Sequence, residues 1–466
     1  MASLVKRCWA TGLSLRRRIS AGSRNFADRK LCPKMTMSTG VDSSPSSSRK
    51  ISPWLMLPPV IEDGGDTVYK FYNLSEDKEE SFLRNSEVEM AEHDAKFVGS
   101  SHGWLALFNR RNNNHIFMYN PITGRHIKLP SIETLPGPKI KWVSKLILSS
   151  SPDDDDTDEC IAIMTFGQGD RLAFCHPCRS TKWTPIGELF YSDCHESYLI
   201  DEVVYAYGRA YEDFVYWGRL KLFTCITQFE IDLFSLSLCY PTCQLEDWDL
   251  SDPHSPIQIT CSGGERGDRK RFGFEGDDEW IDQNLSLLDK CRRIPYLVYA
   301  EQQDQLFIVI RFVMDRVALD GSYVHIDEIP YDPISGRLLG DTYPYKTIGF
   351  CALKVYYRPV NGKEMVDEVS LVQGGSDSLD GLTMFIGMNH SFAVSSADFP
   401  NLKPNSIYFT DANRHASSIY GGHDIGIFDY ANKTLSPCYC YPCVDDVKSL
   451  KRIAPPPMWF TPSLGN

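Results

Sequence analysis

The fold of this chain can be predicted from the stretch Phe117–Arg125, which reads Phe-Met-Tyr-Asn-Pro-Ile-Thr-Gly-Arg. An aromatic-rich strand leads into a polar turn, where Pro121 suits the first corner and Gly124 the later position that requires a positive φ. A second strand is then expected to return beside the first. The stretch therefore predicts a tight β-hairpin.

Weaker versions of this hairpin pattern recur along the chain. They run from Leu172 through Cys178 to Trp183, from Phe229 to Leu238 and from Ile427 to Leu435, and the first three copies begin about 55 residues apart. Tyr331–Arg337 repeats the turn closely, and we expect it either in a blade or in an insertion between strands. The period predicts an all-β fold, a β-propeller of six or seven blades with kelch-like four-stranded blades, and a β-sandwich is the main alternative.

Strand signals continue from Ile51 onward as short apolar and aromatic runs bounded by Gly, Pro, Asn and Asp. The clearest predicted strands are Leu105–Phe108, His115–Tyr119, Ile161–Phe166, Leu222–Ile231, Leu306–Val313, Leu353–Tyr357, Ser406–Phe409 and Ile425–Tyr430. Few helical stretches of useful length are expected.

The N-terminus has the composition of a targeting peptide, because residues 1–27 contain no Asp or Glu. Its basic residues are Lys6, Arg7, Arg16, Arg17, Arg18 and Arg24. If the segment forms a helix, its apolar residues lie along one face, and most of these charges lie away from that face. Arg24-Asn25-Phe26-Ala27 resembles a mitochondrial processing signal, so we predict that residues 1–26 are a mitochondrial transit peptide cleaved after Phe26.

Three alternatives accompany this prediction. The address could be chloroplastic, the segment could be a disordered basic tail for nucleic acid or acidic lipid, and initiation at Met35 could make a cytosolic form. Residues 27–50 are rich in Ser and are predicted to be a disordered linker before a propeller domain at 51–466. No apolar run reaches the ~18 residues that a membrane-spanning helix needs, so we expect no membrane insertion.

Charge limits the range of partners. Removing the six basic residues of the transit peptide changes the formal net charge from −13 to −19. Such an acidic protein repels phosphate backbones, so no nucleic-acid partner is expected, whereas a basic protein partner or a cation is easier to accommodate. The 15 cysteines are odd in number and lie mostly in apolar runs, a pattern that favours buried thiols in a reducing compartment.

Two cysteine motifs are candidate sites for zinc binding or redox chemistry. Cys175-His176-Pro177-Cys178 has the spacing of a redox or zinc half-site, and Cys438, Cys440 and Cys443 could add thiolates. The first motif also falls where a blade hairpin is expected, and no second pair follows at zinc-finger spacing. We therefore predict no metal site and no cofactor.

Other motifs fail on their details. The acids at Asp153–Asp156, Asp158 and Glu159 lack the Gly and Glu of a calcium-binding EF-hand loop, and Gly263–Gly267 lacks the ending of a phosphate-binding loop. The charged stretch Cys261–Trp280 is interpreted as a solvated insertion.

Because no catalytic motif is found, no catalytic residue is predicted. Trp104, Trp142, Trp183, Trp217 and Trp280 could line a recognition face, although we favour blade cores.

Four motifs resemble the KIB-type β-propeller family of plants, a domain of unknown function 295. They are Ser52–Pro59 (SPWLMLPP), Val98–Leu105 (VGSSHGWL), Gly387–Ser391 (GMNHS) and Leu402–Asp411 (LKPNSIYFTD). The resemblance covers roughly residues 51–450. In many relatives an F-box precedes the propeller, and those proteins resemble substrate adaptors of a ubiquitin ligase. Here residues 27–50 leave too little room for an F-box, which implies the organellar branch of the family.

The expected function is therefore a non-enzymatic propeller that binds a protein partner in the organelle. The first alternative is an organellar enzyme with a site at the propeller channel, which buried acids converging on a pocket would indicate. The second is an F-box-type ubiquitin-ligase substrate adaptor in the cytosol.

Overall fold

A computed structural model of the chain divides it into two units, residues 1–50 and 51–466. The structure describes residues 52–62, 66–84, 95–109, 115–135, 142–153, 159–167, 171–187, 198–200, 203–205, 210–228, 243–262, 279–318, 321–325, 328–329, 331–332, 337–338, 343–360, 363–375, 378–411, 421–438 and 453–463. The predicted transit peptide, the linker and Met35 lie outside these residues.

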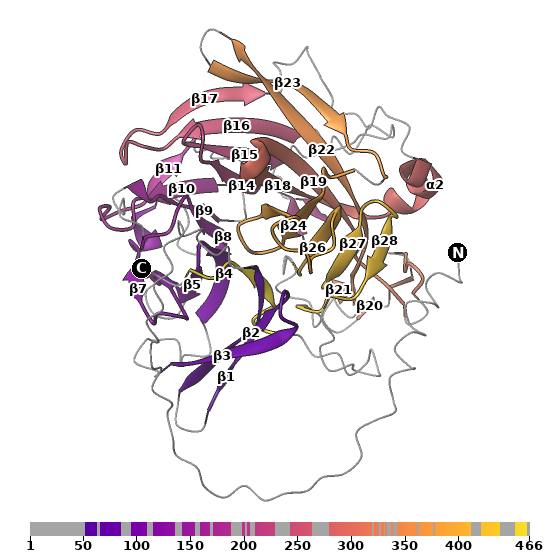
Figure 1. The fold of residues 1–466 in the computed structure, drawn as a ribbon, viewed down its shortest axis with the longest axis horizontal. Helices are drawn as coiled ribbons and strands as arrows, with labels where there is room; N and C mark the ends of the chain where they lie inside the picture. Colours follow the sequence, from indigo (N-terminus) through magenta and orange to yellow (C-terminus); the bar gives the residue numbers. More distant parts are fainter. Residues whose placement is uncertain are drawn as a thin grey trace, which may run out of the picture. The chain divides into compact units, whose positions relative to one another are not determined.

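The described residues form successive four-stranded sheets, which we number as blades (Figure 1). Blade 1 contains β29 (Met458–Phe460), β1 (Trp54–Ile61), β2 (Thr67–Asn73) and β3 (Lys78–Arg84). Blade 2 contains β4 (Ala95–Ser101), β5 (Trp104–Asn109), β6 (His115–Tyr119) and β7 (His126–Lys128). Blade 3 contains β8 (Val143–Leu148), β9 (Ala162–Phe166), β10 (Arg171–Cys175) and β11 (Thr184–Ile186).

The second half of the chain supplies three more blades. Blade 4 contains β14 (Ala210–Trp217), β15 (Leu222–Gln228), β16 (Cys243–Asp249) and β17 (Ile257–Ser262). Blade 5 contains β18 (Arg292–Ala300), β19 (Gln305–Met314), β22 (Lys346–Val360) and β23 (Lys363–Leu371). Blade 6 contains β24 (Leu382–Ile386), β26 (Ser406–Phe409), β27 (Gly426–Asp429) and β28 (Thr434–Ser436), and β25 (Phe392–Ser395) joins it to blade 5.

Smaller elements lie between these strands. Two hairpins pair on their own: β12 (Tyr198–Ile200) with β13 (Val203–Tyr205), and β20 (Tyr331–Asp332) with β21 (Arg337–Leu338). The helical elements are α2 (Glu279–Leu288) and the 3-10 turns η3 (Ile132–Thr134) and η5 (Glu301–Gln303). β20 and β21 pair with each other in a separate two-stranded sheet, so the described residues of Tyr331–Arg337 belong to an insertion between β19 and β22.

Six hydrophobic clusters of the described residues place the blades in a closed ring. Each cluster joins two neighbouring blades, because alternate residues of a strand point to opposite faces of its sheet. On β1, for example, Trp54 and Met56 pack toward blade 2, whereas Leu55 and Leu57 pack with Phe385 of blade 6. The remaining clusters join blades 2 and 3, 3 and 4, 4 and 5, and 5 and 6. The prediction of a propeller of six or seven blades is confirmed, with six blades in the described residues.

The ring is closed by the two ends of the propeller domain. β29 pairs antiparallel with β1, so that Leu55 lies opposite Trp459. Trp459 is fully buried, and its indole Nε1 donates a hydrogen bond to the carbonyl oxygen of Tyr408 in blade 6 at 3.1 Å. The C-terminal strand therefore completes blade 1 and also contacts the last blade.

The hairpin at Phe117–Arg125 forms as expected. β6 and β7 pair around a turn in which the Gly124 amide donates to the Asn120 carbonyl at 2.8 Å. The Asn120 side chain accepts two further backbone amides at 3.0 Å, and Gly124 has a φ of 78°. A non-glycine residue rarely adopts this conformation, which explains the glycine. The related hairpins β10–β11 and β27–β28 are also present, while Phe229–Leu238 lies outside the described residues.

Every clear strand prediction overlaps a described strand, but three features were not predicted. α2 begins inside the stretch predicted as a solvated insertion, and Trp280, the last residue of that stretch, packs edge-on against Phe428 at 6.1 Å. β24 and β26 run parallel, because the chain returns through β25 before it enters β26. β22 and β23 extend beyond the rest of blade 5.

Candidate functional site

A buried ion pair joins the innermost strands of the ring. The ammonium of Lys145 on β8 donates to Asp213 Oδ1 on β14 at 2.6 Å, and the amide of Leu297 on β18 donates to Asp213 Oδ2 at 2.9 Å. The Asp213 side chain is 1% exposed. One carboxylate thus links blades 3, 4 and 5 close to the ring axis, because the first strand of each blade lines that axis.

The segment Gly387–Ser391 contacts these innermost strands. The amide of His390 donates to the Ser100 carbonyl on β4 at 2.7 Å, and the imidazoles of His390 and His102 lie 5.6 Å apart. Met388 packs in the cluster between blades 1 and 2. We call Ser100, Lys145, Asp213, Asn389, His390 and Ser391 the axial cluster.

The imidazole of His390 is held neutral by its surroundings. Burial of the ring, together with the nearby His102 and Lys145, holds the pKa of His390 well below its usual value. Protonation would place a second positive charge beside Lys145 in a region with little water. His390 can therefore donate or accept a hydrogen bond at Nε2, depending on its tautomer.

Several buried polar atoms of the axial cluster have no hydrogen-bond partner within the described part of the protein. They are Ser100 Oγ, Asn389 Oδ1, His390 Nε2 and Ser391 Oγ. Ser100, Asn389 and Ser391 are each at most 2% exposed. Buried polar groups are normally paired, so a group of unpaired ones in one place indicates a site that takes a further partner.

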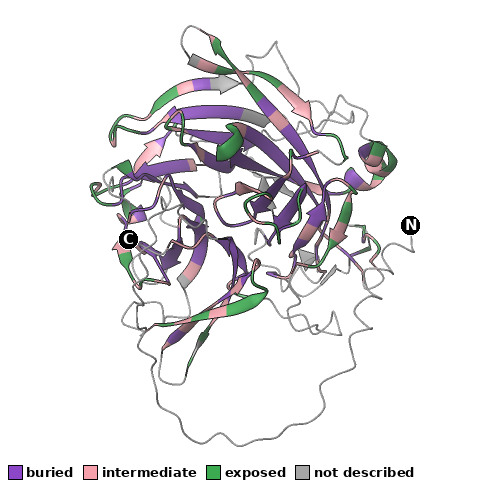
Figure 2. Cartoon of the chain, in the orientation of Figure 1, coloured by how far each residue is buried: buried purple, intermediate pink, exposed green. Residues whose placement is uncertain are grey.

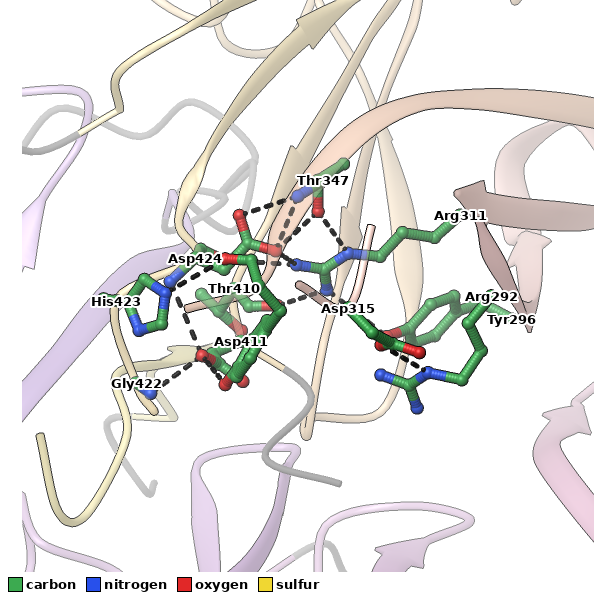
Figure 3. A network of polar contacts seen from close by, with 11 residues as sticks. Arg292, Tyr296, Arg311, Asp315, Thr347, Thr410, Asp411, Gly422, His423 and Asp424 are labelled. Carbon is green, nitrogen blue, oxygen red and sulfur yellow. Dashed lines mark hydrogen bonds and ion pairs between the residues drawn. The ribbon is translucent and has the colours of Figure 1, made fainter. Parts of the chain in front are cut away.

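A second polar group, which we call the seam network, lies between blades 5 and 6 (Figure 3). Its centre is Arg311 on β19, whose guanidinium donates to Thr347 Oγ1 at 2.7 Å, to the Thr410 carbonyl at 2.7 Å and to Asp424 Oδ2 at 2.8 Å. The hydroxyl and the amide of Thr347 also donate to Asp424, at 2.7 Å and 3.0 Å. Five residues make up the network: Arg311, Tyr345, Thr347, Asp411 and Asp424.

Both carboxylates of the seam network accept hydrogen bonds from within the protein. Tyr345 donates its hydroxyl to Asp411 Oδ2 at 2.5 Å, and the amide of Gly422 donates to the same oxygen at 2.7 Å. Burial and the adjacent Asp411 raise the pKa of Tyr345 above its usual range. Burial is the largest single effect and lowers the pKa of Arg311, but Asp424, Tyr296 and Asp411 together outweigh it and raise that pKa. The network therefore holds two blades together around a charged guanidinium and a protonated Tyr345 hydroxyl.

Thr410 connects the two polar groups. Its carbonyl accepts from Arg311, and its amide donates to the Ile386 carbonyl at 3.0 Å, next to the Gly387–Ser391 segment. A Cβ at Gly387 would lie within 3.1 Å of both Thr410 Oγ1 and Asn389 Oδ1, so only glycine fits there. The hydroxyl of Thr410 also lacks a described partner.

The sequence did not predict the axial cluster as a site, although the motifs that form it carry the family resemblance. Val98–Leu105 carries Ser100 and His102, Gly387–Ser391 carries the central segment, and Leu402–Asp411 carries Thr410. A further signal was available in β8 and β19, where Lys145 and Arg311 are single charges inside apolar strands. A charge in such a position is almost never buried without a partner.

The motif Cys175–Cys178 is the turn between β10 and β11, as the hairpin interpretation proposed. The amide of Ser180 donates to the His176 carbonyl at 2.9 Å, and His176 Nε2 lies 3.2 Å from the Leu250 carbonyl. Cys175 is buried and Cys178 is exposed, so the two thiols have different surroundings. Burial, followed by the neighbouring Cys160, raises the pKa of Cys175 well above its usual value, which opposes thiolate chemistry.

The other candidate motifs are only partly described. Asp153 pairs with Arg125, while Asp154–Asp158 lies outside the described residues, as do Gly263–Gly267, Cys440 and Cys443. Cys438 is partly buried, and burial raises its pKa to about 12. Across the described ranges, no group of three or more His, Cys, Asp or Glu side chains is arranged to hold a metal ion.

The tryptophans divide between core and surface. Trp104, Trp183 and Trp217 are buried in the clusters between blades, whereas Trp280 is half-buried on α2. Trp142 is 41% exposed and does not belong to a core. The preference for blade cores therefore holds for three of the five residues and fails for Trp142.

Within the described ranges, no helix has the length and apolar character that a bilayer crossing requires.

A comparison with known families gives one match that spans well over half of the chain. A sequence model of the KIB1-4 β-propeller matches residues 71–429. This range contains all of the axial cluster and all of the seam network. No match to a curated protein was found.

Among solved structures, two similar chains are glycoside hydrolases. One is a family 43 β-1,3-galactosidase with galactodeoxynojirimycin, at 9% identity and a TM-score of 0.26, covering 68% of this chain and 93% of its own. The other is a family 117 enzyme from the marine bacterium Zobellia galactanivorans, at 9% identity and a TM-score of 0.15, covering 72% of this chain and 76% of its own. Likenesses this weak carry no argument about function.

Proposed function

The chain belongs to the KIB1-4 β-propeller family, and from this premise we propose that it is a non-enzymatic module that binds a protein partner in an organelle. The observation that carries the proposal is an exposed arm on blade 5. β19 pairs with β22 only as far as Val355, so Tyr356–Val360 pairs with β23 alone. This arm is at the top of Figure 2, where exposed residues occur along both strands.

The arm has the chemistry of a protein contact surface. Tyr356 is 42% exposed and Met365 is 39% exposed, and both residue types are enriched where proteins meet. On the opposite side, Tyr357 packs edge-on against Trp217 of blade 4 at 4.6 Å, which fixes the base of the arm. An exposed apolar surface on a fixed base favours recognition of a partner without large rearrangement.

The use of the buried carboxylates supports a binding role over an enzymatic one. Asp213, Asp411 and Asp424 each accept hydrogen bonds from neighbouring blades or loops, and Asp247 accepts from Thr224 and Thr260 within blade 4. Asp411 and Asp424 lie together in the seam network, Asp213 pairs with Lys145, and Asp247 accepts from two threonines, so each carboxylate serves a contact within the protein. The enzyme alternative would have to use the axial cluster, where unpaired polar groups gather.

Affinity purification tests the binding role. The full chain with a C-terminal tag is expressed in plant cells, crosslinked in isolated mitochondria and recovered with its partners for mass spectrometry. We expect a specific protein to be enriched, and to be lost from the double variant Tyr356→Ala with Met365→Ala. Leu83→Ala, on the 52% exposed Leu83 of β3, is the matched control and should retain the partner. If no protein is enriched over the tag alone, the proposal is wrong.

The organellar address is a separate part of the proposal. It rests on the acid-free, Arg-rich residues 1–27 and on the processing signal around Phe26. N-terminal sequencing of the protein from purified mitochondria should find Ala27 as the first residue. An intact Met1 in that fraction would contradict import with cleavage, and recovery from chloroplasts would favour the alternative address.

A further inference from the structure

Three sequence motifs that are far apart in the chain meet at the axial cluster. The Val98–Leu105 motif supplies Ser100, the Gly387–Ser391 motif supplies Asn389, His390 and Ser391, and the Leu402–Asp411 motif ends beside them at Thr410. Neither the arm nor the seam network uses these side chains. Their polar atoms are buried, and the seam network shows that this protein can pair buried polar atoms completely.

The charges around the cluster exclude an ionic ligand. Lys145 and Asp213 pair at 2.6 Å, and Arg311 beyond Thr410 pairs with Asp424 at 2.8 Å. His390 is neutral because burial, His102 and Lys145 lower its pKa. An ion placed here would have no free opposite charge, and burying an unpaired charge is strongly unfavourable. A ligand must therefore be uncharged.

The unpaired atoms also specify hydrogen-bonding character. Asn389 Oδ1 is an amide oxygen and can only accept, while the amide nitrogen of this side chain donates to the His390 carbonyl at 2.6 Å. Ser100, Ser391 and Thr410 carry hydroxyls that can donate and accept, and His390 Nε2 can do either. A ligand hydroxyl donates and accepts at once, so several adjacent hydroxyls match this mixed set.

We infer that the axial cluster, with Thr410, is a binding site for a small uncharged polyhydroxylated molecule. This inference is independent of the proposed protein partner, which would contact the arm. His390 is half-buried, and its Nε2 atom is buried.

Calorimetric titration of the full chain tests the inference with glycerol, glucose and myo-inositol as probes. We expect saturable binding of at least one probe and a rise in the melting temperature with its concentration. Gluconate, in which C1 of glucose is oxidised to a carboxylate, should not bind.

Ser391→Ala and Ser100→Ala separate binding from folding. Loss of one ligand hydrogen bond should weaken binding about 3- to 10-fold. Without a probe the same variants should match or exceed the wild-type stability, since each removes an unpaired buried hydroxyl. Thr227→Val is the matched control, because the Thr227 hydroxyl on β15 is also buried without a described partner but lies outside the cluster.

Three outcomes would overturn the inference. The first is the absence of saturable binding for all three probes. The second is tighter binding of gluconate than of glucose. The third is affinity unchanged by both serine variants, which would place the bound probe elsewhere.

Discussion

The axial cluster and the seam network are both built around a buried ion pair between blades, yet they differ in completeness. Arg311 donates to Thr347, Tyr296, Thr410 and Asp424, and no polar side-chain atom of the five network residues lacks a described partner. In the axial cluster, the ammonium of Lys145 has one described hydrogen bond, and four neighbouring polar atoms have none. A fully paired network rigidifies a structure, whereas the partly paired axial cluster is the site that we propose for a ligand.

The largest expected effect tests the seam network. Arg311→Met should lower the free energy of unfolding by about 3 to 5 kcal/mol, because Asp424 would remain buried without its cation. Urea denaturation measures the change. The double variant Arg311→Met with Asp424→Leu should recover much of the loss, since it removes both charges. A loss below about 1 kcal/mol for the single variant would contradict the assigned role.

Lys145→Met applies the same test to the axial cluster. We expect a smaller loss, about 3 kcal/mol, because Asp213 keeps the hydrogen bond from the Leu297 amide. The same denaturation experiment gives the comparison. If Lys145→Met cost more than Arg311→Met, the axial pair would be the main structural contact, and the contrast between the two regions would be reversed.

Removal of one hydroxyl from each region should lower the stability of the protein by clearly different amounts. Thr347→Val should cost about 1 to 3 kcal/mol, because its hydroxyl bridges Arg311 and Asp424. Ser100→Ala in the free protein should cost nothing measurable, since its hydroxyl has no described partner. Thermal unfolding of the two variants side by side provides the measurement. Equal losses would show that the axial hydroxyls are paired in solution.

The smallest expected effect depends on pH. The pKa of His390 is lowered in the folded protein, so below about pH 6.5 the unfolded chain binds a proton that the folded protein does not. Stability should therefore fall with decreasing pH by about 1.4 kcal/mol per unit for this group, until the pH reaches its folded-state pKa. His390→Gln should remove that slope.

The control for the pH experiment is His254→Gln, at an exposed position outside blade cores. The difference between the two variants, measured by urea denaturation from pH 7.5 to pH 5.5, isolates the contribution of His390. Parallel pH profiles for wild type and His390→Gln would show that this imidazole is accessible to protons in the folded protein.

The blade hairpins could be predicted from the sequence because their signals are local. Asn120, Pro121 and Gly124 lie within one turn, and the apolar runs beside them match single strands. The two polar regions could not be predicted in the same way. Lys145 and Asp213 are 68 positions apart, and Arg311 and Asp424 are 113 apart, so only the closed ring brings them together.

The strand pairing of blade 6 could not be predicted from the sequence for a related reason. The parallel pairing of β24 with β26 requires the chain to reverse twice within residues 387–405, and no turn pattern distinguishes this path from a simple hairpin. The motif Gly387–Ser391 was recognised, but its position at the axis depends on this reversal. The sequence therefore identified Gly387–Ser391 as a motif but did not show which residues this motif contacts.

The closure of the ring by β29 has a consequence for the order of folding. A ribosome makes a chain from its N-terminus, so β1 is complete long before Trp459 exists to pair with Leu55. Until then blades 1 and 6 expose the apolar faces that later form their shared cluster. In a nascent chain of this protein the ring therefore stays open between blades 1 and 6, and it closes only after Met458–Phe460 has been made.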